Sequence, residues 1–362
     1  MQWNISLQRE ITRDLIIEAA YVGSRSAWYE ANALINLNAI STARFAALGL
    51  DITNPVTQSL LTSTFDSGTP QAAGFKIPYA GFPTSLTLAQ ALRPYPQFGS
   101  INVRWAPLGN SWYDSLQAKV TQRYSHGLTL QAAFTWQKEL SSGADGGAVN
   151  DVFNRRVQKN ISPFSQPLVL STGFTYQLPA FGHNLLVRTA LRDWTIGGVL
   201  RYSSGLPIAA PAANNVLSSY TFQTTFANRV PGQPLFLADL NCHCIDPNKQ
   251  FVLNPAAWTN PANGVYGTSA NFYNDYRYQR RPDEELSLAR TFRIRERMSF
   301  MVRGEFFNVF NRTQMNNPTS GNAQTTPTFN GSGVPVSGFG MINTGSIFNF
   351  TRHGQIVGRF QW

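Results

Sequence analysis

The sequence predicts an all-β fold, the antiparallel wall of a transmembrane β-barrel with about nine strands and long loops. Three observations support this prediction. Apolar and polar residues alternate with a period of two in many segments. The best of these segments are about 12 residues long, which is long for a soluble strand but enough to cross a bilayer at a tilt. Short and long connections also follow one another in turn along the chain.

The strands follow in chain order. Weak alternation predicts the first two, over Trp3 to Arg9 and Leu15 to Val22. The clearest pattern lies between Trp112 and Glu139, where two alternating arms flank Tyr124–Gly127 and predict a long hairpin. Weaker alternation predicts the remaining strands, which cover Gln166 to Leu178, Trp194 to Ser203, Glu284 to Phe292, Met298 to Asn308 and His353 to Trp362.

The connections between these strands differ strongly in length. Short ones lie at Glu10–Asp14, Tyr124–Gly127 and Ile294–Arg297, and a moderate one at Pro179–Asp193. Long structureless loops normally count against a strand assignment, but transmembrane barrels combine short periplasmic turns with long extracellular loops. We therefore expect extracellular loops at about 23–111, 140–165, 204–283 and 309–352.

Composition and charge narrow the class of protein. No run of 18 apolar residues is present, so a transmembrane helix is excluded. The formal charge is +10, with its densest basic run between Arg277 and Arg297. No nucleic-acid reader motif accompanies this charge, so we expect no nucleic-acid partner. A water-filled lumen and the anionic headgroups of outer-membrane lipid and lipopolysaccharide explain the charge more simply.

Motifs for catalysis or metal binding are weak. Cys242 and Cys244 flank His243, but two thiols and one imidazole fall short of a four-ligand zinc site. The simpler interpretation is a loop cysteine pair, which an oxidising exterior would oxidise. The four histidines are scattered, and neither His-Glu-x-x-His nor Gly-x-Ser-x-Gly occurs. We therefore expect no enzyme, no metal site and no cofactor.

Five stretches of the chain stand out: Tyr21-Val22-Gly23-Ser24-Arg25, Arg93 to Ile101, Asn110 to Gln117, Ser204-Gly205-Leu206-Pro207, and Glu305 to Gln314 with Asn316-Asn317-Pro318. In this order they resemble the Oar-like TonB-dependent transporters. They extend over nearly the whole chain, although Ile161–Pro167 lacks the charged residues that relatives often have there. The resemblance implies that residues 1–362 are the C-terminal portion of an outer-membrane barrel of about 22 strands.

The C-terminus is similar to the signal that the barrel-assembly machinery reads. That signal places apolar residues at every second position and ends in an aromatic residue. The corresponding residues here are Ile356, Gly358, Phe360 and Trp362. The family pattern usually has its glycine one position earlier, where Val357 stands. The alternative is an ordinary terminal strand.

The resemblance also implies a function and partners. The complete protein would bind a ligand at its extracellular loops and take it up through a plugged barrel, driven by a TonB-type energy-coupling complex. The sequence contains no recognisable signal peptide, plug or TonB-contacting segment, and Met1–Leu7 has the pattern of a strand, so we expect these parts upstream. The alternatives are a structural or adhesive surface barrel without transport and, less favoured by the strand lengths, a soluble β-sandwich. Loop composition points to no particular ligand.

Overall fold

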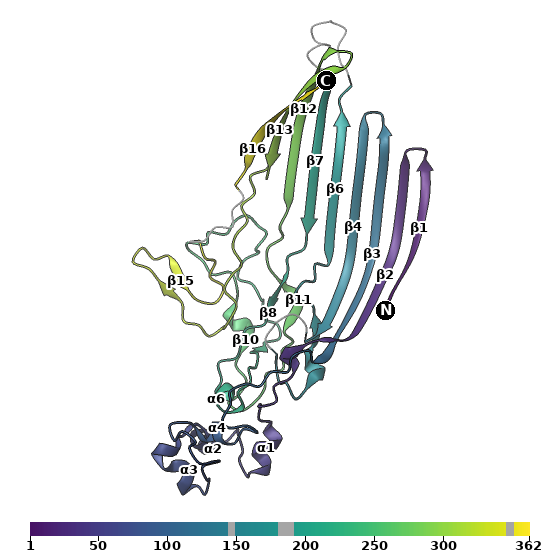
Figure 1. Ribbon diagram of the computed structural model, residues 1–362. Helices are drawn as coiled ribbons and strands as arrows, with labels where there is room; N and C mark the ends of the chain where they lie inside the picture. The colour runs from purple at the N-terminus through teal and green to yellow at the C-terminus, as the bar shows by residue number, and fades with distance from the viewer. Residues whose placement is uncertain (144–148, 180–191, 345–350) are drawn as a thin grey trace.

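The computed structural model describes residues 1–143, 149–179, 192–344 and 351–362, and its main feature is one antiparallel sheet. In this sheet each long strand pairs with the next along the chain, as the prediction of an antiparallel wall requires (Figure 1). The long strands are β1 (Gln2–Thr12), β2 (Leu15–Glu30), β3 (Pro107–Ser125), β4 (Leu128–Ser142), β6 (Leu168–Gln177), β7 (Trp194–Ser203), β12 (Asp283–Arg295), β13 (Met298–Phe307) and β16 (His353–Gln361), and the short β5 (Lys159–Ile161) pairs with the end of β4.

The sheet is open within the described part of the chain. β1 pairs only with β2, and β16 pairs only with β13, so these two strands are its edges. The hairpin turns lie at one end of the sheet and the long connections at the other, which we call the hairpin end and the loop end (Figure 1). The chain starts at the loop end and finishes at the hairpin end.

Every predicted strand is present, but β2 and β3 are longer than the sequence indicates. They continue beyond Val22 and begin before Trp112, and the added residues pair with each other, as Arg25 does with Trp112 and Glu30 with Pro107. Polar residues lie on both faces of this extension, so the period of two that predicted the strands is lost there. The predicted first loop, about 23–111, was therefore too long at both ends.

Two-residue turns join three pairs of strands at the hairpin end. They consist of Arg13-Asp14, His126-Gly127 and Glu296-Arg297. His126 and Gly127 both have positive φ, 50° and 83°, as a type I′ turn requires. The twist of this turn matches that of the strands, so the long β3–β4 hairpin closes tightly. The predicted connection at Pro179–Asp193 lies mostly outside the described residues.

The strand register gives the sheet one apolar and one polar face. Leu116 on β3 is opposite Tyr21 on β2 and Trp136 on β4, and the neighbouring pair Ala118 and Phe134 lies on the same face. Leu116 is 49% exposed, Phe134 40% and Trp136 59%, so the described chain leaves this apolar face uncovered. The opposite face carries polar residues such as Gln117, Lys119, Gln131, Thr175 and Glu305.

The long loops are not structureless, which corrects the expectation from their composition. They contain short helices and two-stranded sheets that lie together at the loop end (Figure 1). The helices are η1 (Asn32–Leu34), α1 (Thr42–Ala47), α2 (Pro55–Thr62), η2 (Phe65–Ser67), α3 (Thr69–Ala72), α4 (Leu88–Ala91), η3 (Arg155–Gln158), α6 (Leu217–Thr221) and η4 (Pro255–Ala257), and the strand pairs are β8 (Pro207–Ala209) with β11 (Phe272–Arg277), β9 (Asn228–Arg229) with β10 (Trp258–Thr259), and β14 (Thr328–Phe329) with β15 (Pro335–Ser337).

None of the helices in the described ranges is long and apolar enough to cross a membrane.

Most of the buried apolar side chains lie in these loops and not in the sheet. One core joins Ile208, Trp258 and Tyr276 of the third loop to Phe339 of the fourth. A second core joins the first loop, including Phe45, Leu61 and Phe65, to Leu217 and Tyr220 of the third loop. Val149 of the second loop packs with Ala31 and Leu34 of the first. We call the described residues of 31–106, 149–165, 204–282 and 308–344 the loop domain, because these apolar contacts join the four loops.

A buried polar network ties the second loop to the third. Asn150 Nδ2 donates to the Gly267 carbonyl at 2.7 Å, Thr225 Oγ1 donates to Asn150 Oδ1 at 2.8 Å, and the Gly267 amide donates to Thr225 Oγ1 at 2.6 Å. A Cβ on Gly267 would lie 1.8 Å from the Phe226 carbonyl oxygen, so only glycine permits this close approach. The network satisfies polar groups that would otherwise be buried without partners.

Candidate functional site

The main candidate site is a pocket of about 600 Å³ where the polar face of the sheet meets the loop domain. Strands β7, β12, β13 and β16 supply side chains from their loop ends, and the third and fourth loops supply the rest. Because strand side chains alternate between faces, the strand residues at odd positions all point to the polar side. The strand residues in the pocket are Arg201, Ser203, Asp283, Glu285, Phe307 and His353, and the other lining residues are Gln166, Ser204, Gly205, Leu206, Tyr278, Gln279, Arg281, Pro282, Asn308, Gln314 and Asn317.

The pocket carries balanced charge on a rigid frame. Two guanidinium groups, of Arg201 and Arg281, face two carboxylates, of Asp283 and Glu285. Arg201 lies directly opposite Asp283 in the strand register. Arg281 Nη2 donates to Asn317 Oδ1 at 3.2 Å. Both donors and acceptors are therefore available to a polar ligand.

Aromatic and amide side chains complete the lining. The rings of Phe307 and His353 stack with their centroids 4.8 Å apart. Gln166 Nε2 donates to Ser203 Oγ at 3.2 Å, and Gln314 Nε2 donates to the Pro282 carbonyl at 3.1 Å. These contacts hold side chains from separate loops against the ends of the strands. Within the described ranges no group of three or more His, Cys, Asp or Glu side chains could hold a metal ion.

Arg277 anchors the loops beside the pocket. Its Nη1 donates to the Ser165 carbonyl at 2.6 Å and to the Gly205 carbonyl at 3.1 Å, and its Nη2 donates to Asn274 Oδ1 at 2.8 Å. Burial lowers the pKa of this guanidinium below its ordinary value, because the charged form is desolvated. The Arg277 side chain therefore fixes the spacing between the second and third loops.

The residues proposed as an assembly signal lie together on the last strand. Ile356, Gly358 and Phe360 of β16 are opposite Gly304, Val302 and Phe300 of β13, which places them on the apolar face. The rings of Phe360 and Trp362 stack at 6.0 Å. None of these four residues lines the pocket, whereas His353 from the start of the same strand does.

Several charged residues of the wall share its polar face. Arg303 Nη2 and Glu305 Oε1 form an ion pair at 2.6 Å, and Lys119 lies opposite Glu18 in the register. Arg123 and Arg359 also occupy odd positions, on β3 and β16, and so belong to the polar face. These residues do not line the pocket, and the ion pair indicates wall structure more than ligand contact.

The sequence did not single out the pocket residues. Arg201 and Glu285 were visible as polar positions in the alternation of two predicted strands, whereas Asp283 fell in the predicted loop. Nothing along the chain showed that these strand ends meet Arg281 and Asn317. Cys242 and Cys244 are joined by a disulfide in the third loop, so neither is available as a thiolate ligand.

Comparison with known proteins identifies the family to which the chain belongs. A family model described as an outer membrane beta barrel domain matches residues 1–355. A search of curated proteins gives no significant match.

The matches among solved structures include three proteins with low sequence identity to this chain. The outer membrane transporter YddB from Escherichia coli is 10% identical over 99% of this chain and 32% of its own, with a TM-score of 0.37. FpvA from P. aeruginosa, bound to heterologous pyoverdines, is 11% identical over 100% of this chain and 27% of its own, with a TM-score of 0.36. The Pseudomonas putida toluene transporter TodX is 12% identical over 85% of this chain and 55% of its own, with a TM-score of 0.24.

The chain thus spans about a third or less of the first two proteins. The family model, in contrast, covers nearly every residue, including all the long strands up to the start of β16. An antiparallel wall with one uncovered apolar face agrees with it. The chain therefore belongs to the outer membrane β-barrel domain family, and its place is the outer membrane.

Proposed function

We propose that this chain is the C-terminal portion of an Oar-like, TonB-dependent outer-membrane transporter, which binds a ligand at its extracellular loops and takes it up through a plugged barrel. The observation that carries the proposal is the pocket between the polar face and the loop domain. A wall with its apolar face toward lipid has its polar face toward the lumen. A ligand in the pocket would therefore sit at the mouth of the lumen.

The orientation of the wall supports this assignment. Barrels of this kind have short periplasmic turns and long extracellular loops, so the hairpin end would face the periplasm and the loop domain the exterior. A solute from outside would meet the pocket lined by Arg201, Arg281, Asp283 and Glu285 before it reached the rest of the lumen. The charges of both signs suit a polar or zwitterionic solute.

The remaining parts of the transporter would come from upstream of Met1. Residues 1–362 would form about nine of about 22 strands, with the open edges β1 and β16 each pairing with the rest of the barrel. The plug and the segment that contacts the TonB-type energy-coupling complex would lie in the same upstream part. Ile356, Gly358, Phe360 and Trp362 would guide insertion by the barrel-assembly machinery.

The test is ligand binding and uptake by the full-length protein. We expect one member of a panel of oligosaccharides, peptides, ferric siderophores and cobalamin to bind. Arg201→Gln with Asp283→Asn should weaken binding by roughly tenfold or more, because both remove a charged hydrogen-bonding partner from the pocket. Arg123→Gln on the hairpin end of the polar face is the matched control and should bind normally. Uptake should require the energy-coupling complex; binding with no uptake would contradict transport.

A surface adhesion role is the second candidate, and the loop domain favours it. This domain has two apolar cores of its own and extends well beyond the sheet (Figure 1). A folded projection of this kind could bind a polymer or another cell without moving a solute. Attachment that persists after loss of the coupling complex and of the pocket charges would support this role instead.

A further inference from the structure

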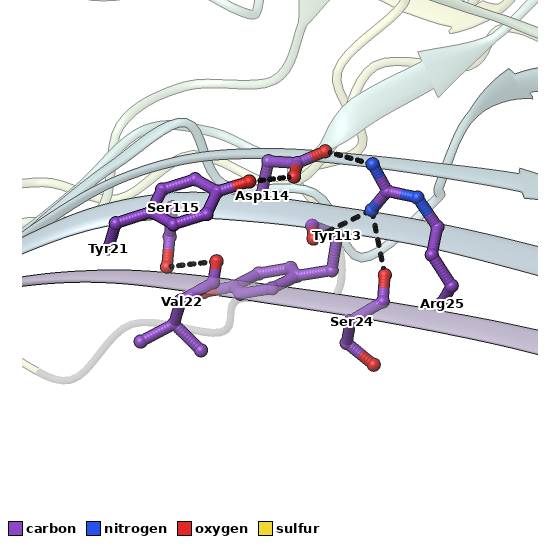
Figure 2. A network of polar contacts seen from close by, with 7 residues as sticks. All are labelled: Tyr21, Val22, Ser24, Arg25, Tyr113, Asp114 and Ser115. Carbon is purple, nitrogen blue, oxygen red and sulfur yellow. Dashed lines mark hydrogen bonds and ion pairs between the residues drawn. The ribbon is translucent and has the colours of Figure 1, made fainter. Parts of the chain in front are cut away.

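Figure 2 shows a polar network that joins β2 to β3 through Tyr21, Arg25 and Asp114. Tyr21 Oη donates to Asp114 Oδ1 at 2.6 Å, and Arg25 Nη2 donates to Asp114 Oδ2 at 2.9 Å. Arg25 Nη1 also donates to the Tyr113 carbonyl at 3.1 Å. Asp114 is the next apolar-face position from Leu116 toward the loop end. Charged groups are costly in hydrocarbon. The hydrocarbon boundary therefore lies between Leu116 and Asp114 on β3.

A groove of about 560 Å³ lies just beyond this boundary. Its cations are Arg155, Arg156 and Lys159, all exposed, and no Asp or Glu is among its lining residues. Lys159 Nζ lies 3.9 Å from the centroid of the Trp112 ring. Within the described residues none of the three cations forms an ion pair. The other lining residues are Trp28, Leu34, Pro107, Leu108, Asn110, Trp112 and Ser142.

The register shows that the groove is on the lipid side of the wall. Trp112 lies opposite Arg25 on β2 and Leu140 on β4, and Ser142 lies opposite Asn110 on β3 and Lys159 on β5. All these positions share the face of Leu116, on the opposite side of the sheet from the pocket with Arg201 and Glu285. The groove is therefore placed at the level of lipid headgroups.

We propose that this basic groove binds the phosphate of an anionic, phosphorylated lipid of the outer leaflet. Among the described lining residues the three cations have no carboxylate between them, so they repel one another, and a phosphate would neutralise them with charge-assisted hydrogen bonds. Guanidinium groups match the geometry of phosphate oxygens, and Trp28 and Trp112 suit the interface between headgroup and hydrocarbon.

The apolar face next to the groove favours a lipid over a free anion as the bound molecule. Below the groove it continues through Leu116 and Trp136, where the acyl chains of a lipid bound by its headgroup would lie. The inference uses the proposed orientation, with the loop end outside, but does not involve the lumen pocket. Lipid binding can therefore fail while solute uptake holds, and the reverse.

The experiment titrates the detergent-purified full-length protein with bis-phosphorylated lipid A and counts bound lipid by native mass spectrometry. Arg155→Gln/Arg156→Gln/Lys159→Gln should weaken binding by roughly tenfold or more, because three charge-assisted contacts are lost together. Arg13→Gln/Arg295→Gln/Arg297→Gln removes the same charge at the hairpin end and should leave binding unchanged. Arg155→Lys/Arg156→Lys/Lys159→Arg keeps the charge and should retain most of the affinity.

Two results would overturn the proposal. One is equal weakening by the groove triple and the hairpin-end triple, which would mean that only net charge attracts the lipid. The other is equal binding of lipid A and its fully dephosphorylated form, which would mean that the groove does not recognise phosphate. Circular dichroism of each variant verifies that the strands have formed.

Discussion

Glu284 is the most deeply buried charged side chain of the described wall, and Arg312 holds it. The Glu284 side chain is 0% exposed, and Arg312 Nε donates to its two oxygens at 2.8 and 3.1 Å. Glu284 lies at the start of β12 on the apolar face, and Arg312 comes from the fourth loop. This contact therefore fastens the loop domain to the wall by a buried ion pair.

Removal of the Arg312 side chain should destabilise the fold. Arg312→Ala leaves the buried Glu284 charge without its partner, and we expect a loss of about 3–5 kcal/mol in the free energy of unfolding. Denaturant unfolding of the full-length protein in micelles measures it. The exposed Arg280, changed to Ala, serves as the control with little expected effect. A loss below about 1 kcal/mol for Arg312→Ala would show that water reaches Glu284.

Asp151 gives a pH-dependent prediction in the second loop. Burial raises the pKa of this carboxyl above its ordinary value of 3.8, because the charged form is desolvated. Between 3.8 and the raised pKa the folded protein binds more protons than the unfolded one, so stability falls as pH rises through this window. Above the raised pKa the ionised Asp151 therefore destabilises the loop domain.

Asp151→Asn should raise the thermal unfolding temperature at pH 7, since it removes the charge and keeps the acceptor for the Phe153 amide. The gain should disappear below the ordinary carboxyl pKa of 3.8. Asp246→Asn is a control of opposite sign, because a hydrogen bond from Lys249 lowers the pKa of Asp246. A gain for Asp151→Asn that does not change with pH would contradict this account.

At the scale of the strand, the hairpin of β3 and β4 provides the most direct test of sidedness. Leu116, Leu130 and Phe134 lie on the apolar face, and Gln117 and Gln131 on the polar face. Single cysteines at the first three positions should react with a thiol reagent dissolved in the bilayer. Cysteines at the last two should react with a water-soluble reagent instead. Cys242 and Cys244 are first replaced by serine, and the reverse labelling pattern would refute the membrane wall.

The same alternation explains which elements the sequence could predict. Every long strand was visible because lipid on one side and water on the other impose a period of two. The extensions of β2 toward Glu30 and of β3 toward Pro107 were missed, since water contacts both faces beyond the hydrocarbon. The residues near Asp114 mark the place where the hydrocarbon on one face gives way to water on both faces.

For the whole molecule, the open edges of the sheet determine whether the chain is stable as a monomer. β1 and β16 each present one unpaired side, and unpaired backbone groups in hydrocarbon cost several kcal/mol each. Residues 1–362 expressed alone should therefore aggregate or assemble into oligomers. Gel electrophoresis with and without boiling tests this. A monomer that migrates faster before boiling would show that the chain closes by itself, and the barrel would then need no further strands.

The sequence by itself determined the wall: its strands, their two faces and the hairpin turns follow from backbone geometry and from the contrast between lipid and water, which act on neighbouring residues. Only the tertiary structure decided the loop domain, the pocket and the basic groove. Phe45 meets Tyr220, Arg281 meets Asn317, and Trp112 meets Lys159 across long stretches of chain. Such contacts depend on the packing of distant segments, which leaves no period in the sequence.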